Sequence, residues 1–378
     1  MNFVMSKMYI RELVLSTPWL KKIYLKRRSK SENDLMNAVQ LDKYLNEAEK
    51  VLLKQFVDIH VGLVKDGDNY ADEGLIKERA SFPKYERFLK ENNISYEYYD
   101  PYTSDWMEKA KQFDLVIWRT DSTPSAQSIA ESKIYILEKM GKKCFPSYDE
   151  VWSYEDKIRA SYLYELYNFP SIPTFISHSK KDTLSYLKGA SYPIISKIST
   201  GSSSYGVDKI ENFSEAKKIV NQVFSYKGKK TYFDYINQKD YVYFQDFIDD
   251  ATYDLRIMCV GNSLFGYYRY PNKGDFRASG AGNYEKKEIP VEALELAYNV
   301  KEKFGTTFLA TDLLYSTKHS KFLIIESSIF IGVDTCEQLS INGVAGRYKR
   351  YETNKYTFEP GKFWVQELTL KNFIEQNF

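Results

Sequence analysis

The amino-acid sequence predicts an α/β fold in its first half and an α+β fold in its second half. Between residue 55 and about residue 150, short apolar runs of strand character alternate with helical patterns, which is typical of a parallel sheet covered by helices. After residue 190, longer strand-like runs follow one another with few helices between them. That pattern favours antiparallel or mixed sheets with helices packed on one side.

The first half contains strands and helices at the spacing of βαβ units. The helix that begins at Pro83 has proline in its first turn and places Tyr85, Phe88 and Leu89 on one face. Asp114–Trp118 (DLVIW) is almost continuously apolar, as expected of a strand buried on both faces. The expected strands are Ile59–Val64, Ile94–Tyr99, Asp114–Trp118 and Lys143–Phe145, and the expected helices are Pro83–Asn92 and Ser125–Met140.

The second half contains longer expected strands, and the chain as a whole divides into four parts. The strands are Ile194–Ile198, Tyr241–Phe247, Leu255–Val260, Leu264–Tyr270 and Leu323–Glu326. We expect a basic helical extension (1–54), a parallel α/β domain (55–150), a central α+β domain (151–248) and a C-terminal mixed-sheet domain (249–378).

Composition excludes several classes of protein. The 378 residues are 43% hydrophobic and 28% charged, as in a globular protein and unlike a disordered or fibrous one. A formal net charge of +2 gives no indication of nucleic acid as a partner. The three cysteines are an odd number without metal-ligand spacing, so we expect no disulfide scaffold and a reducing compartment. Three histidines are too few for a histidine-rich metal site.

The N-terminal segment decides where in the cell we expect the chain. No apolar run reaches the ~18 to 20 residues of a membrane span, and no secretory signal is found, so we expect a cytoplasmic protein. Residues 13–30 contain no acid, and six Lys and Arg residues there are interleaved with aromatic and aliphatic ones. Such a segment can contact an anionic membrane surface, here the inner face. The alternative is a solvated helix or a disordered arm.

Lys197 and the loop after it form the first candidate binding element. Lys197 ends an apolar strand, and the following loop contains Gly201, Gly206 and three serines. Glycine allows close approach of a ligand, and backbone N–H and hydroxyl groups can donate to phosphate oxygens. The alternative is an ordinary flexible connection, since the Walker A lysine is missing. The serines are Ser202, Ser203 and Ser204.

Asp312 and Glu326 form a candidate metal site. Each lies in an apolar stretch of the kind that forms buried strands, and a buried carboxylate needs a cation, a donor or a raised pKa. The connection between the two stretches has the length of a hairpin, which would bring the carboxylates side by side. Such a pair suits Mg²⁺. The alternative is that each carboxylate pairs with a nearby Arg or Lys.

Three arginines form the third element. Arg256 and Arg269 lie on neighbouring expected strands, and Arg277 follows shortly after. Guanidinium groups on one sheet face would bind phosphate or carboxylate groups in a bidentate manner. The alternative for each of them is a structural salt bridge.

In this order and spacing, the elements resemble the ATP-grasp superfamily, especially the RimK-type and glutathione-synthetase-like carboxylate–amine ligases. The resemblance covers about residues 114–333. It includes Asp156–Lys157 at the start of a helix, Phe169–Thr174 as a "giPtP-t" segment, and Tyr192–Lys197 followed by the Gly/Ser loop and "GV". Asp254–Arg256 resembles the family's "D-R" strand, and Lys273–Ser279 resembles its "GdfR-N" segment.

The resemblance implies an ATP-grasp fold, with the central domain as a small lid, and the cofactors ATP and Mg²⁺. Lys157 and Lys197 would hold the nucleotide phosphates, and the Gly/Ser loop would close over them. Asp312 and Glu326 fall where the family has its Mg²⁺ ligands. Ser328 stands where the family usually has Asn, and serine is a shorter and poorer ligand. The strand whose backbone would bind adenine is Gln245, Asp246, Phe247 and Ile248.

The resemblance further implies an ATP-dependent ligase that forms an amide bond through an acyl phosphate. Arg256, Arg269 and Arg277 would lie near the transferred phosphate and the acceptor. The substrates would be a carboxylate and an amine, either small molecules or parts of a cell-envelope or capsular glycan. Two alternatives remain, a small-molecule kinase that uses the same ATP site and an ATP-binding pseudoenzyme or scaffold.

Overall fold

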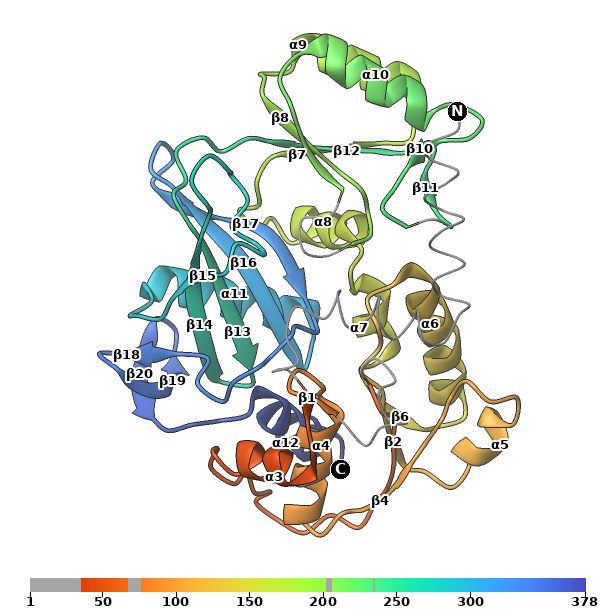
Figure 1. The fold of residues 1–378 in the computed structure, drawn as a ribbon, viewed down its shortest axis with the longest axis vertical. Coiled ribbons are helices and arrows are strands. Elements are labelled where there is room, and N and C mark those ends of the chain that lie inside the picture. The colour runs from red at the N-terminus through yellow and green to blue at the C-terminus, as the bar shows by residue number, and fades with distance from the viewer. Residues whose placement is uncertain (1–34, 67–75, 202–205, 234) are drawn as a thin grey trace. The chain divides into compact units, whose positions relative to one another are not determined.

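The computed structural model describes residues 35–66, 76–201, 206–233 and 235–378 (Figure 1). The basic segment at residues 13–30 lies outside them. Backbone contacts divide the chain into two units, Met1–Asn46 with Gly67–Ala80 and Glu47–Asp66 with Ser81–Phe378. In the first unit, β1 (Leu35–Met36) pairs antiparallel with β3 (Ile76–Lys77), and α3 (Ala38–Leu45) begins at an Asn37–Gln40 capping box. All features described below belong to the second unit.

The predicted parallel α/β layer is present. Its strand order is β4-β2-β5-β6, and all neighbours are parallel. Gly62 in β2 leaves room for the Phe113 ring, since a Cβ at residue 62 would lie 2.7 Å from that ring. The strands are β2 (His60–Leu63), β4 (Ser95–Tyr98), β5 (Leu115–Ile117) and β6 (Lys143–Phe145), and the helices are α4 (Phe82–Glu91), α5 (Trp106–Ala110) and α6 (Pro124–Lys139).

Two short helices, α7 (Tyr148–Ser153) and α8 (Lys157–Leu166), lead from this layer into a second sheet. That sheet has the antiparallel order β7-β12-β8-β9, and α9 (Lys180–Gly189) and α10 (Phe213–Val223) pack against it. The apolar face of α10 buries Ala216 and Val220 against the sheet. The strands are β7 (Thr174–Ser177), β8 (Ile194–Lys197), β9 (Val207–Ile210) and β12 (Val242–Asp246), with a small hairpin of β10 (Lys229–Lys230) and β11 (Asn237–Gln238).

The third sheet is the largest and is antiparallel. Its order is β17-β16-β13-β14-β19-β18, with β15 beside β14 and β20 beside β19. Helix α11 (Val291–Phe304) packs on β13 and β16, and α12 (Val365–Asn377) packs on α4 and β13. The strands are β13 (Asp254–Val260), β14 (Ser263–Tyr270), β15 (Asn283–Glu285), β16 (Phe308–Ser316), β17 (Lys321–Ser328), β18 (Ser340–Ile341), β19 (Val344–Glu352) and β20 (Lys355–Pro360).

Every strand and helix expected from the sequence has a counterpart within two residues at each end, and β17 shows the largest difference, two residues longer at both ends. The C-terminal hairpin β19–β20 and helix α12 were not predicted. Arg347, Lys349 and Arg350 interrupt the apolar alternation of β19, so that strand carries little signal in the sequence.

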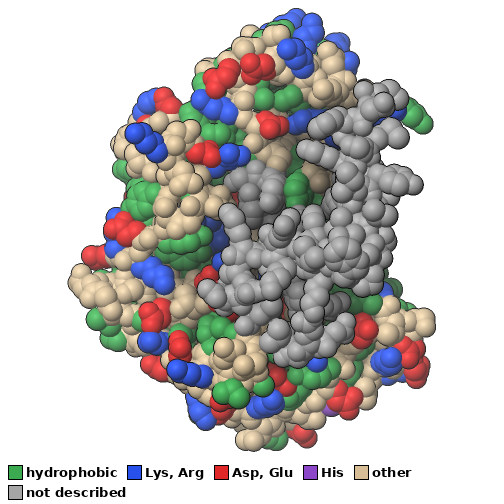
Figure 2. Space-filling model, in the orientation of Figure 1, with side chains coloured by type: hydrophobic (Ala, Val, Ile, Leu, Met, Phe, Trp, Pro, Cys, Tyr) green, Lys and Arg blue, Asp and Glu red, His purple; other side chains and the backbone are tan. Residues whose placement is uncertain are grey.

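The described surface carries charges of both signs. Figure 2 shows Lys and Arg side chains on the outer face of α9 and α10, with acidic and basic side chains mixed over much of the remaining described surface in that view. No described helix has the length and apolar character needed to span a bilayer.

Glu150 joins the parallel layer to the large sheet. It lies in the first turn of α7, where it forms a capping box with Ser147. One carboxylate oxygen accepts from the Ser147 N–H at 2.8 Å, and the other accepts from the Thr307 N–H, just before β16, at 2.6 Å. Burial raises the pKa of Glu150 against the opposing effect of these hydrogen bonds.

We predict that Glu150→Ala destabilises the protein by about 2 kcal/mol, because it leaves the buried Thr307 N–H and the part-buried Ser147 N–H without acceptors. Urea unfolding followed by circular dichroism measures the loss. The matched control is Asp149→Ala, since Asp149 lies in the same turn but is exposed; it should change stability by less than about 0.5 kcal/mol. Equal effects of the two substitutions would contradict this role of Glu150.

Candidate active site

Strands β16 and β17 form the predicted hairpin, and Asp312 lies directly opposite Glu326 in it. Ala310 lies opposite Ser328 in the same register. Because side chains alternate along a strand, the residues at 310, 312, 326 and 328 share one face of the sheet. A β-bulge follows Asp312 and shifts the register of the hairpin beyond it. The two acidic side chains therefore meet on one face.

Asp312 is held by two arginines. Arg256 on β13 donates through Nε to one oxygen and through a terminal nitrogen to the other, both at 2.7 Å. Arg269 on β14 donates to Asp312 at 2.6 Å and also pairs with Asp254. The alternative stated from the sequence, in which the carboxylate pairs with arginine, therefore describes Asp312 in this structure. Arg256 and Arg269 both take part in salt bridges here.

The network fixes the charge states of its members. Burial would raise the pKa of Asp312, but Arg256 and Arg269 hold that pKa well below its usual value. Burial raises the pKa of Asp254 to about 6, although Arg269 opposes the shift. Asp312 is therefore ionised throughout the neutral range.

The donor set fits a Mg²⁺ ion that is also bound by phosphate. A carboxylate has about four lone-pair sites, and three hydrogen bonds to Asp312 leave one site on the oxygen that faces Arg256 Nε. Glu326 is 38% exposed, and its ion pair with Lys157 is long, at 3.8 Å. The described residues include no cluster of three or more His, Cys, Asp or Glu side chains suited to a metal. Mg²⁺ commonly takes one or two carboxylates and completes its shell with substrate phosphates and water.

Lys157 lies at the first position of α8, after the N-cap Asp156. Its backbone N–H donates to Ser199 and its ammonium donates to the Gly201 carbonyl at 2.5 Å. Both partners lie where the Gly/Ser loop begins. The same ammonium is the one that pairs with Glu326. Lys157 thus lies between the loop and the metal-site carboxylates.

Lys197 lies at the end of β8 and is almost fully buried. Its ammonium donates to Gln245 on the neighbouring strand β12 at 2.6 Å. Burial lowers the pKa of Lys197 to about 8; Glu326 opposes the shift, and Lys157 adds to it. Among the described residues, the ammonium of Lys197 has a hydrogen bond only to this neutral side chain, and such a cation is suited to bind an anion.

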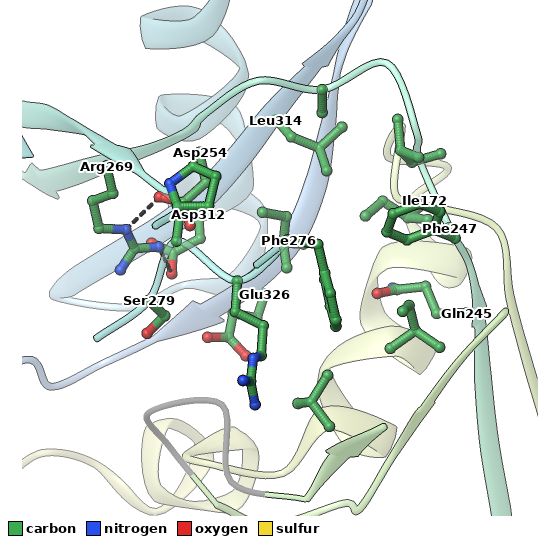
Figure 3. A pocket seen from close by; sticks show the side chains of 18 of the residues that line it. Ile172, Gln245, Phe247, Asp254, Arg269, Phe276, Ser279, Asp312, Leu314 and Glu326 are labelled. Atoms are coloured by element: carbon green, nitrogen blue, oxygen red, sulfur yellow. Dashed lines mark hydrogen bonds and ion pairs between the residues drawn. The ribbon is translucent and has the colours of Figure 1, made fainter. Parts of the chain in front are cut away.

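These residues line one cavity of about 340 Å³. That volume lies within the range of small-molecule sites, roughly 300 to 1,000 Å³. Figure 3 shows Asp254, Arg269 and Asp312 together on one side of the cavity and Phe247, Ile172 and Gln245 on the opposite side. The cavity thus has a charged side and a more apolar one. The predicted site residues that line it are Lys157, Lys197, Gln245, Asp246, Phe247, Ile248, Arg269, Arg277, Asp312 and Glu326.

The Arg277 loop closes part of the cavity. Arg277 forms a bidentate pair with Asp275 in the same loop, and the pair is largely exposed. Phe276 packs edge-on against Phe247 at 5.7 Å between ring centres. Among the described residues, Arg277 therefore pairs within its own loop and takes no part in the ion network of Arg256 and Arg269.

The side chain of Ser328 contacts Phe330 and Glu155 and does not line the cavity. Its hydroxyl donates to the Phe330 carbonyl at 2.7 Å and lies 3.5 Å from a carboxylate oxygen of Glu155. Glu155 has a φ of 53°, and burial raises its pKa, with Glu326 adding to the shift and Lys157 opposing it. Ser328 is not among the described residues that line the cavity, and neither is Arg256.

Ser202, Ser203 and Ser204 lie outside the described residues. Gly206 is described and has a φ of 72°. A Cβ at residue 206 would lie 2.6 Å from the Ile198 side chain, so both the backbone conformation and the space require glycine.

Sequence reasoning missed Asp254, which lines the cavity, and Glu155, which lies beside Ser328. Asp254 was noted only as part of the "D-R" strand, although it shares Arg269 with Asp312. Glu155 immediately precedes the Asp156–Lys157 pair, but nothing in its local sequence shows that it faces Ser328 across the fold.

Comparison with known proteins identifies the family. The model of the RimK-like ATP-grasp domain matches residues 155–346, more than half of the chain. The chain belongs to the RimK-like ATP-grasp family. The resemblance to the ATP-grasp superfamily, the ATP-grasp fold class and the ligase class, all predicted from the sequence, are confirmed.

Similar proteins agree with this assignment. Over 242 residues the chain is 27% identical to the α-aminoadipate–LysW ligase LysX of Saccharolobus solfataricus, which covers 62% of this chain and 79% of that protein. Among solved structures, D-cycloserine synthetase DcsG superposes with a TM-score of 0.53 at 13% identity, covering 71% of this chain and 91% of that one. A D-alanine–D-alanine ligase from Bacillus anthracis gives 0.50 at 12% identity, covering 72% and 87%. At such identities the two structures show the fold alone.

We predict that nucleotide affinity depends on pH through Lys197. Since its pKa is about 8 in the free protein, the ammonium is charged below pH 8 and loses its proton above it. The affinity for the Mg²⁺ complex of the non-hydrolysable analogue AMP-PNP should fall about tenfold between pH 7 and pH 9, as measured by calorimetry.

Two variants test the assignment of this titration. Lys197→Met should bind AMP-PNP weakly and lose the pH dependence between pH 7 and pH 9. Lys180→Met, at an exposed position in α9, should keep the wild-type profile. A flat wild-type profile over this range would show that Lys197 does not hold the phosphates.

Proposed function

We propose that this ATP-grasp protein joins a carboxylate to an amine at the expense of ATP, through an acyl-phosphate intermediate. One observation carries the proposal: Asp312 and Glu326 lie opposite each other on a cavity that Lys157 and Lys197 also line. Acidic groups for a metal and cations for phosphates converge there. Phosphoryl transfer needs positioning and charge stabilisation more than it needs a protein nucleophile.

In the proposed complex, each side of the cavity has a separate role. The apolar side around Ile172 and Phe247 takes the adenine, and the backbone of residues 245–248 binds its edge. Lys157 and Lys197 bind the phosphates. Asp312 and Glu326 would hold Mg²⁺, which supplies charge neutralisation at the phosphate oxygens when bound. Arg269, anchored by Asp254, orients the Asp312 carboxylate.

In the first step, an oxygen of the substrate carboxylate attacks the γ-phosphorus of ATP. The bond from that phosphorus to the bridging oxygen breaks, and ADP leaves with the electron pair. In the second step, the amine nitrogen attacks the acyl carbon and the bond to the phosphate oxygen breaks. An amide, inorganic phosphate and one proton result. Arg277 lies in the loop that borders the cavity and would bind the transferred phosphoryl group after release from Asp275.

A catalytically inactive ATP-binding protein is the second candidate. Ser328 replaces the usual Asn, and its hydroxyl already donates to the Phe330 carbonyl. In that case the protein binds nucleotide without transferring phosphate. A trapping experiment separates the two candidates.

We predict that hydroxylamine traps the acyl phosphate as a hydroxamate when ATP, Mg²⁺ and a panel of carboxylic acids are supplied. Glu326→Gln should lower the rate at least about a hundredfold, because it removes one charged ligand near the phosphates. Glu326 is 38% exposed, so this variant should keep its melting temperature. Colorimetric detection of the hydroxamate with ferric ion gives the rate.

The matched control is Glu352→Gln, since Glu352 lies on the exposed part of β19 and pairs only with Lys355 among the described residues. It should retain the full rate. Hydroxamate formation that is undiminished in Glu326→Gln would contradict the ligase site. Tight AMP-PNP binding without hydroxamate from any acid in the panel would favour the inactive ATP-binding protein.

A further inference from the structure

Arg119 lies at an edge of the parallel sheet that the nucleotide cavity does not use. It follows β5, and Asp66 follows the adjacent parallel strand β2. Open sheets of parallel strands bind ligands at the carboxyl ends of their strands. All described residues that line the nucleotide cavity lie at or beyond Lys157 in the chain, so none comes from this sheet.

The guanidinium of Arg119 has no hydrogen-bond partner among the described residues. Its Nε is buried without a partner, and the nearest carboxylate oxygen, on Asp66, lies 3.5 Å away. Its central carbon lies 5.8 Å from the centre of the Phe330 ring. The side chain is 21% exposed, so a ligand can reach the group. An arginine has five N–H donors, and since Nε is buried beside Asp66, the four N–H groups of the two terminal nitrogens are the ones left for a ligand.

The carboxylate of Asp66 accepts its hydrogen bonds from other donors, and not from Arg119. Its two oxygens accept from the Ser81 N–H at 3.0 and 2.9 Å, and one also accepts from the Phe82 N–H at 2.6 Å. These groups begin helix α4, whose N-terminal end itself stabilises a negative charge. The carboxylate is therefore shared between the helix N-terminus and its ion pair with Arg119 at 3.5 Å.

Other low-exposure arginines of the described chain behave differently. Arg87, Arg256 and Arg350 each donate to a carboxylate at 2.7 or 2.8 Å. In those three arginines, a carboxylate of the fold accepts a short hydrogen bond from the guanidinium, as expected of a structural salt bridge. Arg119 also has low exposure, but among the described residues its only carboxylate contact is the longer pair with Asp66, which leaves its terminal N–H groups for a ligand.

We infer that Arg119 binds an oxyanion of the substrate, a carboxylate or a phosphate group, at the carboxyl edge of the parallel sheet. The planar fork of a guanidinium matches either group in a bidentate manner. Phe330 supplies an apolar wall, and it lies two residues after Ser328, just beyond the strand that carries Glu326. Bound there, the anion sits on the side of the nucleotide site that faces the parallel layer.

This inference rests on the proposed ligase activity only in assigning the anion to the acceptor substrate. It identifies that substrate as one that carries an anionic group for recognition by Arg119. The binding itself can be measured without any turnover.

The test is calorimetry of the full chain, with the nucleotide cavity saturated by AMP-PNP and Mg²⁺. Succinate and inorganic phosphate are titrated separately as probes. At least one should bind, and Arg119→Gln should weaken that binding tenfold or more, since charge-assisted hydrogen bonds are lost. Binding of succinate alone identifies a carboxylate site, and binding of phosphate alone identifies a phosphate site.

The control is Arg347→Gln. Arg347 also stacks over a phenylalanine, Phe363, at 4.3 Å, but it pairs with Glu359 and lies on β19. It should leave probe binding unchanged. If Arg119→Gln does not fold, Arg119→Lys keeps the charge without the fork and should weaken binding by a smaller factor.

Three results would overturn the inference: neither probe binds the wild type, Arg119→Gln binds as tightly as the wild type, or Arg347→Gln weakens binding equally. None of them touches the ligase proposal, because AMP-PNP binding and hydroxamate formation are measured separately.

Discussion

The ion network around Asp312 is the interaction on which the candidate site depends. Asp254 and Asp312 face Arg269 and Arg256 within a sheet where unpaired charges would be strongly unfavourable. Because the two carboxylates and two guanidiniums balance each other, Asp312 stays ionised in a buried position. Lys157 and Lys197 then remain as two cations near Glu326, and these ammonium groups are the ones that can bind an anionic ligand.

The fold brings these groups together from three places in the chain. The β16–β17 hairpin places Asp312 opposite Glu326, while β13 and β14 carry the two arginines beside them. Lys197 comes from the second sheet, and Lys157 comes from the helix that leads into it. The lysines therefore belong to a different layer from the carboxylates. A change in the position of the second sheet would alter the distance between the two lysines and the two carboxylates.

The sequence predicted the parallel layer, the central and C-terminal strands and the hairpin, since apolar periodicity and chain length determine them. Ten of the predicted site residues line the cavity, because family motifs carry that information, whereas Arg256, Gly206 and Ser328 do not line it. It did not predict that both arginines would pair with Asp312, since those contacts depend on the register between three strands. The loose pairing of Arg119 and the contact between Glu155 and Ser328 depend on packing between distant segments, which leaves no local pattern.

The most direct test of the central claim is a crystal structure with Mg²⁺ and AMP-PNP. We expect a metal ion about 2.0 to 2.1 Å from oxygens of both Asp312 and Glu326, with the ammonium groups of Lys157 and Lys197 on the phosphates. A nucleotide bound with its phosphates away from these lysines, or a metal ion that contacts neither carboxylate, would contradict this claim.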